Sequence, residues 1–295
     1  MKVKKSAGDI LFDVFNYLFM LLIVVIMLAP MIHVVSVSFS SGEEALRGGL
    51  FLWPRGFNLK AYEQVFQDDM ILRTYLNTIL YTIANTILTL LFTSLTAYPL
   101  SVAGFCLKKP VTVYLTLTMF ISGGTIPTYL LMKSLHLINN PMVMFIPFIV
   151  GAYNVILFRT FFSGIDSGIR ESARIDGASE FRILFQIILP LSKAILATVG
   201  LFTLVGKWND WFSALIYLTE EKYYPVQMIL RKILFNSRAF VGMDADVMRM
   251  FRDNTIQPVN IQMATIVVVT LPIVCIYPFI QKYFAKGVMI GSIKG

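Results

Sequence analysis

Long uncharged apolar runs dominate the pattern of residues along this chain of 295 residues. A helix needs about 20 apolar residues to cross roughly 30 Å of hydrocarbon. Each of five runs without Asp, Glu, Lys or Arg exceeds that length, so each predicts a membrane-spanning helix. These runs cover residues 14–42, 74–107, 111–132, 134–158 and 254–281.

A sixth segment, from about Pro190 to Leu218, is also apolar but contains Lys207 and Asp210. In hydrocarbon every backbone amide must find its partner inside the segment, which makes helices the default spanning structure. The pattern therefore predicts an all-α integral membrane protein with six transmembrane helices. Their expected ranges are 14–37, 77–104, 111–133, 141–162, 191–217 and 260–283.

The composition supports this prediction. Hydrophobic residues make up 57% of the chain and charged residues only 14%, whereas about a quarter of the residues of a soluble protein are charged. The net charge of +8 is spread over short segments between the apolar runs, so a nucleic-acid partner is not expected. Cys106 and Cys275 are far apart in the sequence and indicate neither a disulfide framework nor a metal site.

Basic residues are densest in the short segments on one side of the expected spans, such as Lys108-Lys109 and the stretch from Lys282 to Lys294. Short cytoplasmic segments are enriched in Lys and Arg, which places both termini in the cytoplasm. The first apolar run is longer than that of a signal peptide, so we expect an uncleaved span. The expected organisation is a cytoplasmic tail over 1–13, a six-span domain over 14–285 with outer loops 38–76 and 218–259, and a cytoplasmic tail over 286–295.

The connection between the fourth and fifth expected spans, residues 163–190, is polar at its start and apolar at its end. Ile169, Ala173 and Asp176 fall on one helical face. Ala173 and Gly177 are small, which lets another backbone approach closely, and Gly177 permits a sharp turn. Two interpretations stay open on these residues alone. The segment is either an amphipathic loop at the lipid headgroups or a helix that docks into a groove of a cytoplasmic partner.

The same loop carries a series of residues at fixed spacings: Glu171, Ser172, Ala173, Gly177, Ile187, Leu189 and Pro190. The series resembles the signature of importer-type ABC permeases, which is Glu-Ala-Ala, three residues, Gly, nine residues and Ile-x-Leu-Pro, with Ser172 as the one departure. Asp176-Gly177-Ala178 is similar to the version found in carbohydrate permeases. Pro190 also suits the first helical turn of the next expected span. The last residues, 281–295, resemble the end of the maltose-type second permease subunit, closest to the branch for complex or plant-derived oligosaccharides.

The resemblance implies a type I ABC importer permease that carries oligosaccharides across the bacterial cytoplasmic membrane. The implied partners are a second permease subunit, an ATPase dimer and an extracytoplasmic solute-binding protein. In this family the loop forms a coupling helix that docks into a cleft of the ATPase. ATP and Mg²⁺ belong to that ATPase, and no cofactor is expected on this chain. The expected coupling residues are Glu171, Ser172, Ala173, Asp176, Gly177, Ala178 and Pro190.

ATP hydrolysis by the chain itself is not expected, so it is not predicted to be an enzyme. A P-loop needs Gly, four residues and Gly-Lys-Ser/Thr, and the nearest approach, Gly200 to Lys207, has the wrong spacing. His33 and His136 are isolated and predict no catalytic or metal cluster. An ion-driven secondary transporter usually shows acidic residues in several spans and inverted repeats. A membrane-embedded enzyme needs a cluster of polar residues at the span ends, and the sequence indicates neither.

The segment from Lys207 to Trp211 lies near the outer end of the fifth expected span. Charges inside a membrane helix usually face protein or water, and the spacing of Lys207 and Asp210 allows them to pair. Trp208 and Trp211 are expected to share a helical face, where indole rings suit the apolar side of a sugar, while Asn209 and Asp210 suit its hydroxyls. The alternative is an interfacial tryptophan belt with a snorkelling Lys. Similarity of this string to carbohydrate permeases favours a substrate pathway along Trp208, Asn209, Asp210 and Trp211.

Two further patterns predict local structure. Residues 223–234 of the second outer loop show the apolar periodicity of a short amphipathic helix. The resemblance implies that this loop meets the binding protein, and the alternative is a helix that lies on the membrane surface. Gly123-Gly124 beside Pro127 predicts an irregular point within the third span.

Overall fold

The structure, a computed structural model, describes residues 6–49, 52–240 and 258–292. Every regular element within these ranges is helical, which confirms the all-α prediction. Parts of four predicted segments lie outside the described residues. They are residues 1–5 and 293–295 of the expected cytoplasmic tails, residues 50–51 of the first outer loop and residues 241–257 of the second outer loop.

The chain divides into two compact units. The first contains Met1–Asp69 and Leu230–Leu271, and the second contains Met70–Ile229 and Pro272–Gly295. Two helices cross from one unit into the other, so each contributes residues to both. They are α13 (Val226–Phe240) and α15 (Pro258–Ser292).

The first unit is built around the end of α1 (Ala7–Ser38) and the start of α15. Val37 and Ala45 are buried there, with Val259 and Met263 packed against them. Asn260 is 2% exposed, and its amide group donates to the carbonyls of Val37 and Ser40 at 3.0 Å each. This amide satisfies backbone acceptors where α1 ends. Two short helices complete the unit, α2 (Gly42–Arg47) and α3 (Lys60–Gln67).

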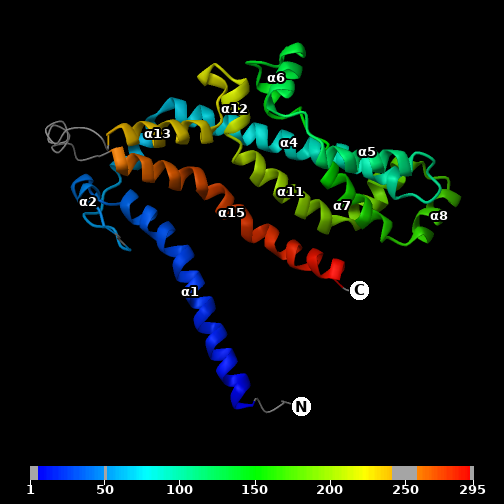
Figure 1. The fold of residues 1–295 in the computed structure, drawn as a ribbon, viewed down its shortest axis with the longest axis horizontal. Helices are drawn as coiled ribbons and strands as arrows, with labels where there is room; N and C mark the ends of the chain where they lie inside the picture. Colours follow the sequence, from blue (N-terminus) through cyan, green and yellow to red (C-terminus); the bar gives the residue numbers. More distant parts are fainter. Residues whose placement is uncertain (1–5, 50–51, 241–257, 293–295) are drawn as a thin grey trace. The chain divides into compact units, whose positions relative to one another are not determined.

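The second unit contains α4 and the elements that follow it. Figure 1 shows α8 at one end of this unit and α12 at the other. Its elements, apart from the shared helices, are α4 (Asp69–Ser101), α5 (Lys108–Phe120), α6 (Thr125–Ser134), η1 (Pro141–Met144), α7 (Ala152–Ser163), α8 (Ser167–Ile175), α9 (Glu180–Ile183), the π-helical turn η2 (Leu184–Ile188), α10 (Leu189–Leu191), α11 (Lys193–Trp208), α12 (Phe212–Tyr217) and η3 (Glu221–Tyr223).

The core of the second unit lies near the α8 end. Phe158 and Val155 of α7 are fully buried, and α7 packs against both α5 and α11. Val199 of α11, Ala97 of α4 and Ile183 of α9 belong to the same apolar cluster. Burial of these side chains removes apolar area from water or lipid and fixes the helices that surround α8.

Three helices are long and apolar enough to cross a membrane unbroken: Gly8–Ser38 in α1, Asp69–Ser101 in α4, and Pro258–Pro278 in α15. Two further helix pairs pass the same test if each pair is counted as one span. The chain bends by 117° between α5 and α6 and by 83° between Glu180–Leu191 and Lys193–Trp208. The described residues therefore provide up to five spans by length and composition.

The fourth expected span, residues 141–162, is not one continuous helix. It consists of η1, an irregular stretch and α7, which has 12 residues. Twelve residues of α-helix extend only about 18 Å, less than the hydrocarbon thickness. Phe148 in the irregular stretch has a φ of 61°, a left-handed backbone conformation that no helix accommodates.

The bend between α5 and α6 confirms the irregular point predicted at Gly123-Gly124. Gly124 has a φ of +81°, which favours a residue without a side chain, and a Cβ added there would meet nothing within 4 Å. The N–H of Gly124 donates to the Ser122 hydroxyl at 3.2 Å. The bend thus combines the left-handed backbone of Gly124 with the Ser122 hydroxyl, which accepts the N–H of Gly124.

The second bend corrects the expected place of Pro190. Pro190 lies in α10, before the break at Ser192, and α11 begins only at Lys193. Proline has no N–H to donate, and the preceding turn η2 widens so that the N–H of Leu189 donates to the carbonyl of Leu184. Pro190 therefore belongs to the distorted end of the first arm and not to the first turn of the next span.

The short helix predicted over 223–234 is confirmed as α13, which begins at Val226. The segment just before α13 is held against α4. Asn77 donates to the carbonyls of Lys222 and Tyr224 at 2.8 and 3.1 Å, and the N–H of Val226 donates to the Thr78 hydroxyl at 2.8 Å. These bonds fix where the outer segment starts.

Substitution of Asn260 by Leu is expected to lower the free energy of unfolding by about 2 kcal/mol, because two buried carbonyls lose their donor. The measurement is chemical unfolding of the purified protein in detergent. Gln262→Leu is the matched control, since Gln262 lies on the same helix and is only partly buried. Equal stability of the two variants would contradict the role given to the Asn260 amide.

Candidate coupling surface and polar break

The helix α8 begins with a side-chain cap. Asp166 precedes it, and the Asp166 carboxylate accepts the N–H of Gly168 at 2.9 Å. A carboxylate at this position satisfies an amide that has no partner in the helix and interacts favourably with the helix dipole. The start of α8 is therefore fixed by local chemistry.

The end of α8 is closed by a glycine motif. Gly177 has a φ of +78°, and its N–H donates to the carbonyl of Arg174 at 3.0 Å. The N–H of Ala178 donates to the carbonyl of Ala173 at 2.9 Å. This pair of bonds is the Schellman arrangement, which needs a left-handed residue just past the helix end. The turn predicted at Gly177 is confirmed.

The faces of α8 divide the predicted coupling residues into two groups. Ala173 is 8% exposed and packs in the apolar core of its own unit, and its part in the coupling contact stays a prediction. Ala178 also packs against this core. Because the helix is amphipathic, one of its faces is buried, and Ala173 is on that face. The exposed members of the predicted set are Glu171, Ser172, Asp176, Gly177 and Pro190.

One exposed apolar side chain on α8 was missed by the sequence analysis. Ile175 is 86% exposed at the end of α8. A large aliphatic side chain at this exposure is suited to insertion into an apolar groove of another protein. The sequence feature that could have identified Ile175 is its position between Arg174 and Asp176 in a polar stretch. The helical pattern there does not require an apolar side chain.

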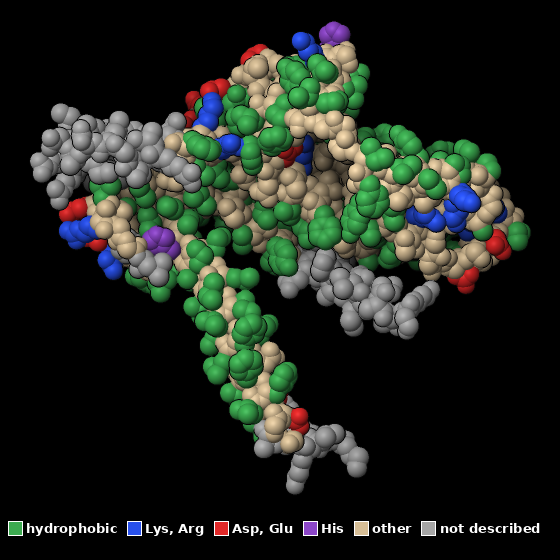
Figure 2. All heavy atoms as spheres, in the orientation of Figure 1, with side chains coloured by type: hydrophobic (Ala, Val, Ile, Leu, Met, Phe, Trp, Pro, Cys, Tyr) green, Lys and Arg blue, Asp and Glu red, His purple; other side chains and the backbone are tan. Residues whose placement is uncertain are grey.

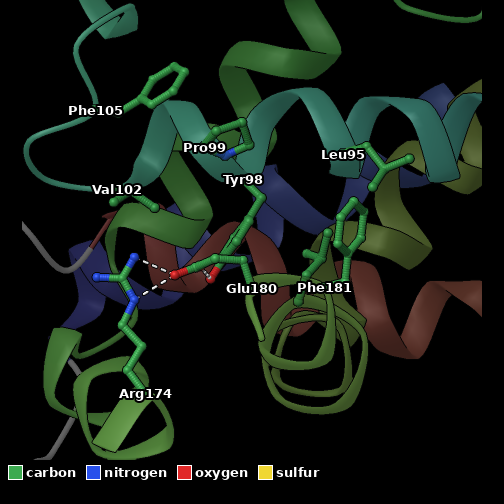
Figure 3. Close-up of a pocket in the computed structure, with 9 residues that line it drawn as sticks. Leu95, Tyr98, Pro99, Val102, Phe105, Arg174, Glu180 and Phe181 are labelled. Carbon is green, nitrogen blue, oxygen red and sulfur yellow. Dashed lines mark hydrogen bonds and ion pairs between the residues drawn. The ribbon is translucent and has the colours of Figure 1, made fainter. Parts of the chain in front are cut away.

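A carboxylate joins α8 to α4 through α9. Glu180 accepts the hydroxyl of Tyr98 at 2.6 Å through one oxygen and pairs with the guanidinium of Arg174 through the other. Figure 3 shows the three side chains pointing toward one another from α4, α8 and α9. Tyr98 is only 6% exposed, so this hydrogen bond is partly shielded from water. The contact ties α8 to a long membrane helix.

An open cavity of about 540 Å³ lies beside this contact. Apolar side chains supply most of its wall, and Phe181 at its rim is 69% exposed. Figure 3 shows Leu95 and Phe181 on one side and Arg174 on the other. The lining residues are Leu95, Tyr98, Pro99, Val102, Phe105, Arg174, Glu180, Phe181 and Leu184.

The sequence analysis did not single out Tyr98 or Glu180. They are 82 positions apart in the chain, and the bond between them depends on how α4 and α9 pack. A tyrosine at the end of an apolar run is also common at membrane interfaces. The sequence position of Tyr98 therefore did not indicate a functional contact. Only the three-dimensional arrangement brings its hydroxyl to the carboxylate.

At the other end of the unit, the fifth span breaks where the polar segment was identified. The helix α11 ends at Trp208, and α12 begins at Phe212. The ion pair predicted for Lys207 and Asp210 is confirmed, with 2.8 Å between Nζ and Oδ2. Asp210 also accepts the N–H of Ser213 at 3.0 Å and so caps the start of α12. Both charges are mostly shielded, and each has a partner.

Trp208 and Trp211 do not share a helical face, which corrects the prediction. Trp208 is 4% exposed, and its ring meets Tyr75 edge-on with 5.6 Å between centroids. Trp211 lies beyond the helix end, half-buried, and packs edge-on against Phe212. The shared face was expected from unbroken helical spacing, and that spacing is lost at the break.

Asn209 is the exposed member of this segment. Its amide nitrogen donates to the carbonyl of Val205 at 3.0 Å, and its oxygen accepts from the side chain of Gln227 at 2.9 Å. Two amide side chains thus meet on an accessible surface at the helix break. Amides carry donors and acceptors together, which suits binding of neutral hydroxyl groups.

A turn beside this break is fixed by Asn139. Its side-chain oxygen accepts the N–H groups of Thr219 and Glu220 at 3.2 and 3.0 Å. Hydrogen bonds from Lys222 and Asn139 hold the pKa of Glu220 below its ordinary value. Asn139 itself has a φ of 56°, a conformation that asparagine adopts more readily than most residues.

Neither end of the unit carries a metal cluster. No group of three or more His, Cys, Asp or Glu side chains comes together among the described residues. A membrane-embedded helical bundle with an exposed, capped helix at one end and a polar helix break at the other has the form of a transporter subunit.

The comparison with known families agrees with this class. The family described as "Binding-protein-dependent transport system inner membrane component" matches residues 3–290. Because the match covers nearly the whole chain, this chain belongs to that family. It is the permease component of an ATP-binding-cassette importer in the inner membrane and not an ion-driven secondary transporter.

Similar proteins support the same class over the full length. "Polygalacturonan/rhamnogalacturonan transport system permease protein YtcP" of Bacillus subtilis (strain 168) is 39% identical over 285 residues, which are 97% of this chain and 99% of that protein. "Protein LplC" of the same organism is 38% identical over 294 residues, 98% of this chain and 97% of that protein.

A solved structure establishes the fold. It is a chain of the "Crystal structure of a bacterial ABC transporter involved in the import of the acidic polysaccharide alginate". The two chains superpose with a TM-score of 0.88 and are 31% identical in sequence. The match covers 96% of this chain and 100% of that chain. The type I importer permease fold expected from the sequence is confirmed.

Substitution of Tyr98 by Phe is expected to weaken the link between α8 and α4, because it removes only the hydroxyl that donates to Glu180. The loss is about 1–2 kcal/mol for a hydrogen bond to a charged acceptor. We expect a lower thermal midpoint and weaker stimulation of ATP hydrolysis in the assembled importer. Tyr114→Phe is the matched control, since Tyr114 is 67% exposed on α5. Identical behaviour of both variants would contradict the link.

Proposed function

We propose that this chain is one of two permease subunits of an importer that carries oligosaccharides across the bacterial cytoplasmic membrane. The second permease completes the pathway, an ATPase dimer drives it, and an extracytoplasmic binding protein delivers the cargo. The observation that carries the proposal is α8, a capped helix that exposes Glu171, Asp176 and Ile175 at one end of its unit.

The proposed coupling contact is the exposed side of α8. Glu171, Ser172 and Asp176 provide polar contacts to the ATPase, and Ile175 inserts into an apolar groove there. Ala173 and Ala178 keep α8 seated on its own core, and Gly177 forms the turn. ATP and Mg²⁺ are held by the ATPase, and this chain binds no cofactor in the proposal.

The orientation follows from this assignment. With α8 on the cytoplasmic side, both termini are cytoplasmic, in agreement with the density of Lys and Arg in the short segments. The break at Trp208–Trp211 is then near the outer end of its span. Motion of the docked ATPase reaches the membrane helices through Arg174, Glu180 and Tyr98. Pro190 and the bend at Ser192 are the joint between the segment Glu180–Leu191, which follows α8, and α11.

The proposed substrate pathway passes the polar break. Asn209 and Gln227 offer amide donors and acceptors to sugar hydroxyls, and Trp211 offers a half-buried aromatic surface. Asp210 acts mainly by holding Lys207 and the start of α12 in place. Trp208 stabilises the helix break through the edge-on contact of its ring with Tyr75.

The proposed cargo is an acidic oligosaccharide. Two of the similar proteins support this class: one is named for polygalacturonan and rhamnogalacturonan, and the other belongs to an importer of the acidic polysaccharide alginate. Both are at least 31% identical to this chain over nearly its full length. A more distant relative, 27% identical, is named for arabinooligosaccharides. Arabinose oligosaccharides therefore serve as the neutral sugars in the cargo experiment.

Substitution of Gly177 by Asp is expected to lower transport about tenfold, equivalent to ~1.4 kcal/mol, with normal amounts of protein in the membrane. Aspartate tolerates the left-handed backbone at this position, so the fold is kept while a charge enters the docking surface. The measurement is substrate uptake by the reconstituted importer, normalised to the amount of permease.

Two controls separate the docking surface from the backbone. Gly177→Asn has nearly the same shape without the charge and should retain most of the transport. Gly104→Asp introduces the same charge at a glycine with a φ of +79° and open surroundings, but outside α8, and should leave transport unchanged. Normal uptake in Gly177→Asp, or equal loss in Gly104→Asp, would show that α8 is not the coupling contact.

The cargo is tested with the complete importer and its binding protein. We expect galacturonate oligosaccharides to stimulate ATP hydrolysis about tenfold more strongly than neutral arabinose oligosaccharides of equal length, a preference of ~1.4 kcal/mol. Stimulation by the neutral sugar alone would overturn the acidic class and keep the oligosaccharide class. No response to any oligosaccharide, with an intact and assembled complex, would overturn both.

A further inference from the structure

A second cavity lies where α5 begins beside α7. Its volume is about 370 Å³, and it is separate from the cavity at Glu180 apart from the shared wall of Phe105. Three cationic side chains from two helices line it. The lining residues are Phe105, Cys106, Lys108, Lys109, Thr112, Val113 and Arg159.

Arg159 is the unusual member of this set. It lies in α7, four residues before the last residue of that helix, so its Cα is about 6 Å inside the helix end. An arginine at this depth is costly unless it meets an anion, water or a polar cavity. Its guanidinium donates to the hydroxyl of Thr112 at 3.2 Å, and that hydroxyl donates to the carbonyl of Lys108 at 2.6 Å. Thr112 thus aims Arg159 at the start of α5.

The positive charges of this cavity have no carboxylate partner on the described part of the chain. Lys108, Lys109 and Arg159 take part in none of the ion pairs within residues 6–49, 52–240 and 258–292, and the first turn of α5 contains no acidic residue. The positive end of the α5 dipole adds to their field. Three cations around one cavity repel one another, and an anion would relieve that repulsion.

The surroundings indicate what kind of anion fits. Lys108 and Lys109 begin α5, an apolar helix, and Arg159 is near the end of α7. Val113, one turn further along α5, is 51% exposed, and Phe105 supplies a second apolar wall. Figure 2 shows Lys and Arg side chains gathered at the end of the unit where α5 and α8 lie, next to hydrophobic side chains. The cavity therefore joins a cationic pole to an exposed apolar surface.

We propose that this cavity binds the phosphate headgroup of an anionic phospholipid. Arg159 and Lys108 contact the phosphate, Lys109 adds charge at the entrance, and an acyl chain runs along Val113. A phosphate matches the planar fork of Arg, and basic pockets between membrane helices on the cytoplasmic side bind anionic headgroups. The leaflet is the cytoplasmic one if the orientation under the proposed function is correct, whereas the lipid site itself does not depend on the cargo or on coupling.

The experiment is native mass spectrometry of the complete importer in detergent, titrated with phosphatidylglycerol or with neutral phosphatidylcholine. We expect retention of phosphatidylglycerol in preference to phosphatidylcholine. Arg159→Gln and Lys109→Gln should each weaken the tightest phosphatidylglycerol site about fivefold, the usual effect of one basic residue at an anionic membrane surface. Lys109 is exposed, so its substitution tests the site without disturbing the packing of α7.

Two controls complete the design. Lys193→Gln removes the same charge from an exposed position at the start of α11, outside the cavity, and should leave the affinity unchanged. Arg159→Lys keeps the charge but not the fork, and should bind more tightly than Arg159→Gln. A further arm adds inorganic phosphate, which should not displace the lipid because it lacks the acyl contact with Val113.

Three results would overturn the proposal. The first is an unchanged affinity for phosphatidylglycerol in both Arg159→Gln and Lys109→Gln, which would mean that another group neutralises the cavity. The second is equal binding of phosphatidylcholine, which would show that charge is not recognised. The third is displacement of the lipid by inorganic phosphate, which would make this a site for a free ion.

Discussion

Hydrocarbon offers no hydrogen-bond partner to an open backbone amide, and this constraint governs where the chain can interrupt its helices. Three interruptions in the second unit have a polar side chain beside them. Ser122 accepts an amide at the α5–α6 bend, Ser192 donates to the carbonyl of Ile188 at 2.6 Å, and Asp210 caps the start of α12. The widened turn before Pro190 solves the same problem with the backbone alone. Bent spans are therefore possible only where the sequence places such groups.

The same constraint explains why α8 can serve as a separate element at the membrane surface. Its two ends are closed by Asp166 and by the turn at Gly177, so it needs no neighbour to satisfy its backbone. One face rests on the core through Ala173, and the Glu180 carboxylate connects it to α4. A short helix with both ends closed locally, one face on the core and one polar contact to α4 keeps a defined position in its unit.

The charged groups of this chain differ in the partners that compensate their charge. Lys207 and Asp210 neutralise each other at the break of the fifth span, so that region presents amides and an aromatic ring instead of net charge. Glu180 is shared between Arg174 and Tyr98 near the surface. Within the described ranges, Arg159 donates to the Thr112 hydroxyl and lines a cavity open to the surroundings. These differences distinguish structural pairs from groups available to ligands.

Several features of the protein were determined by the sequence alone. Uncharged runs determined that the chain crosses a membrane as helices, and the spacing from Glu171 to Pro190 indicated the importer family, because both depend on local patterns. Gly124 and Gly177 marked turns, since their conformations are set within a few residues. Packing decided the rest: Ala173 faces its own core, the fifth span ends at Trp208, and Tyr98 meets Glu180. These outcomes depend on side chains far apart in the chain, whose combined packing energy outweighs local helical periodicity.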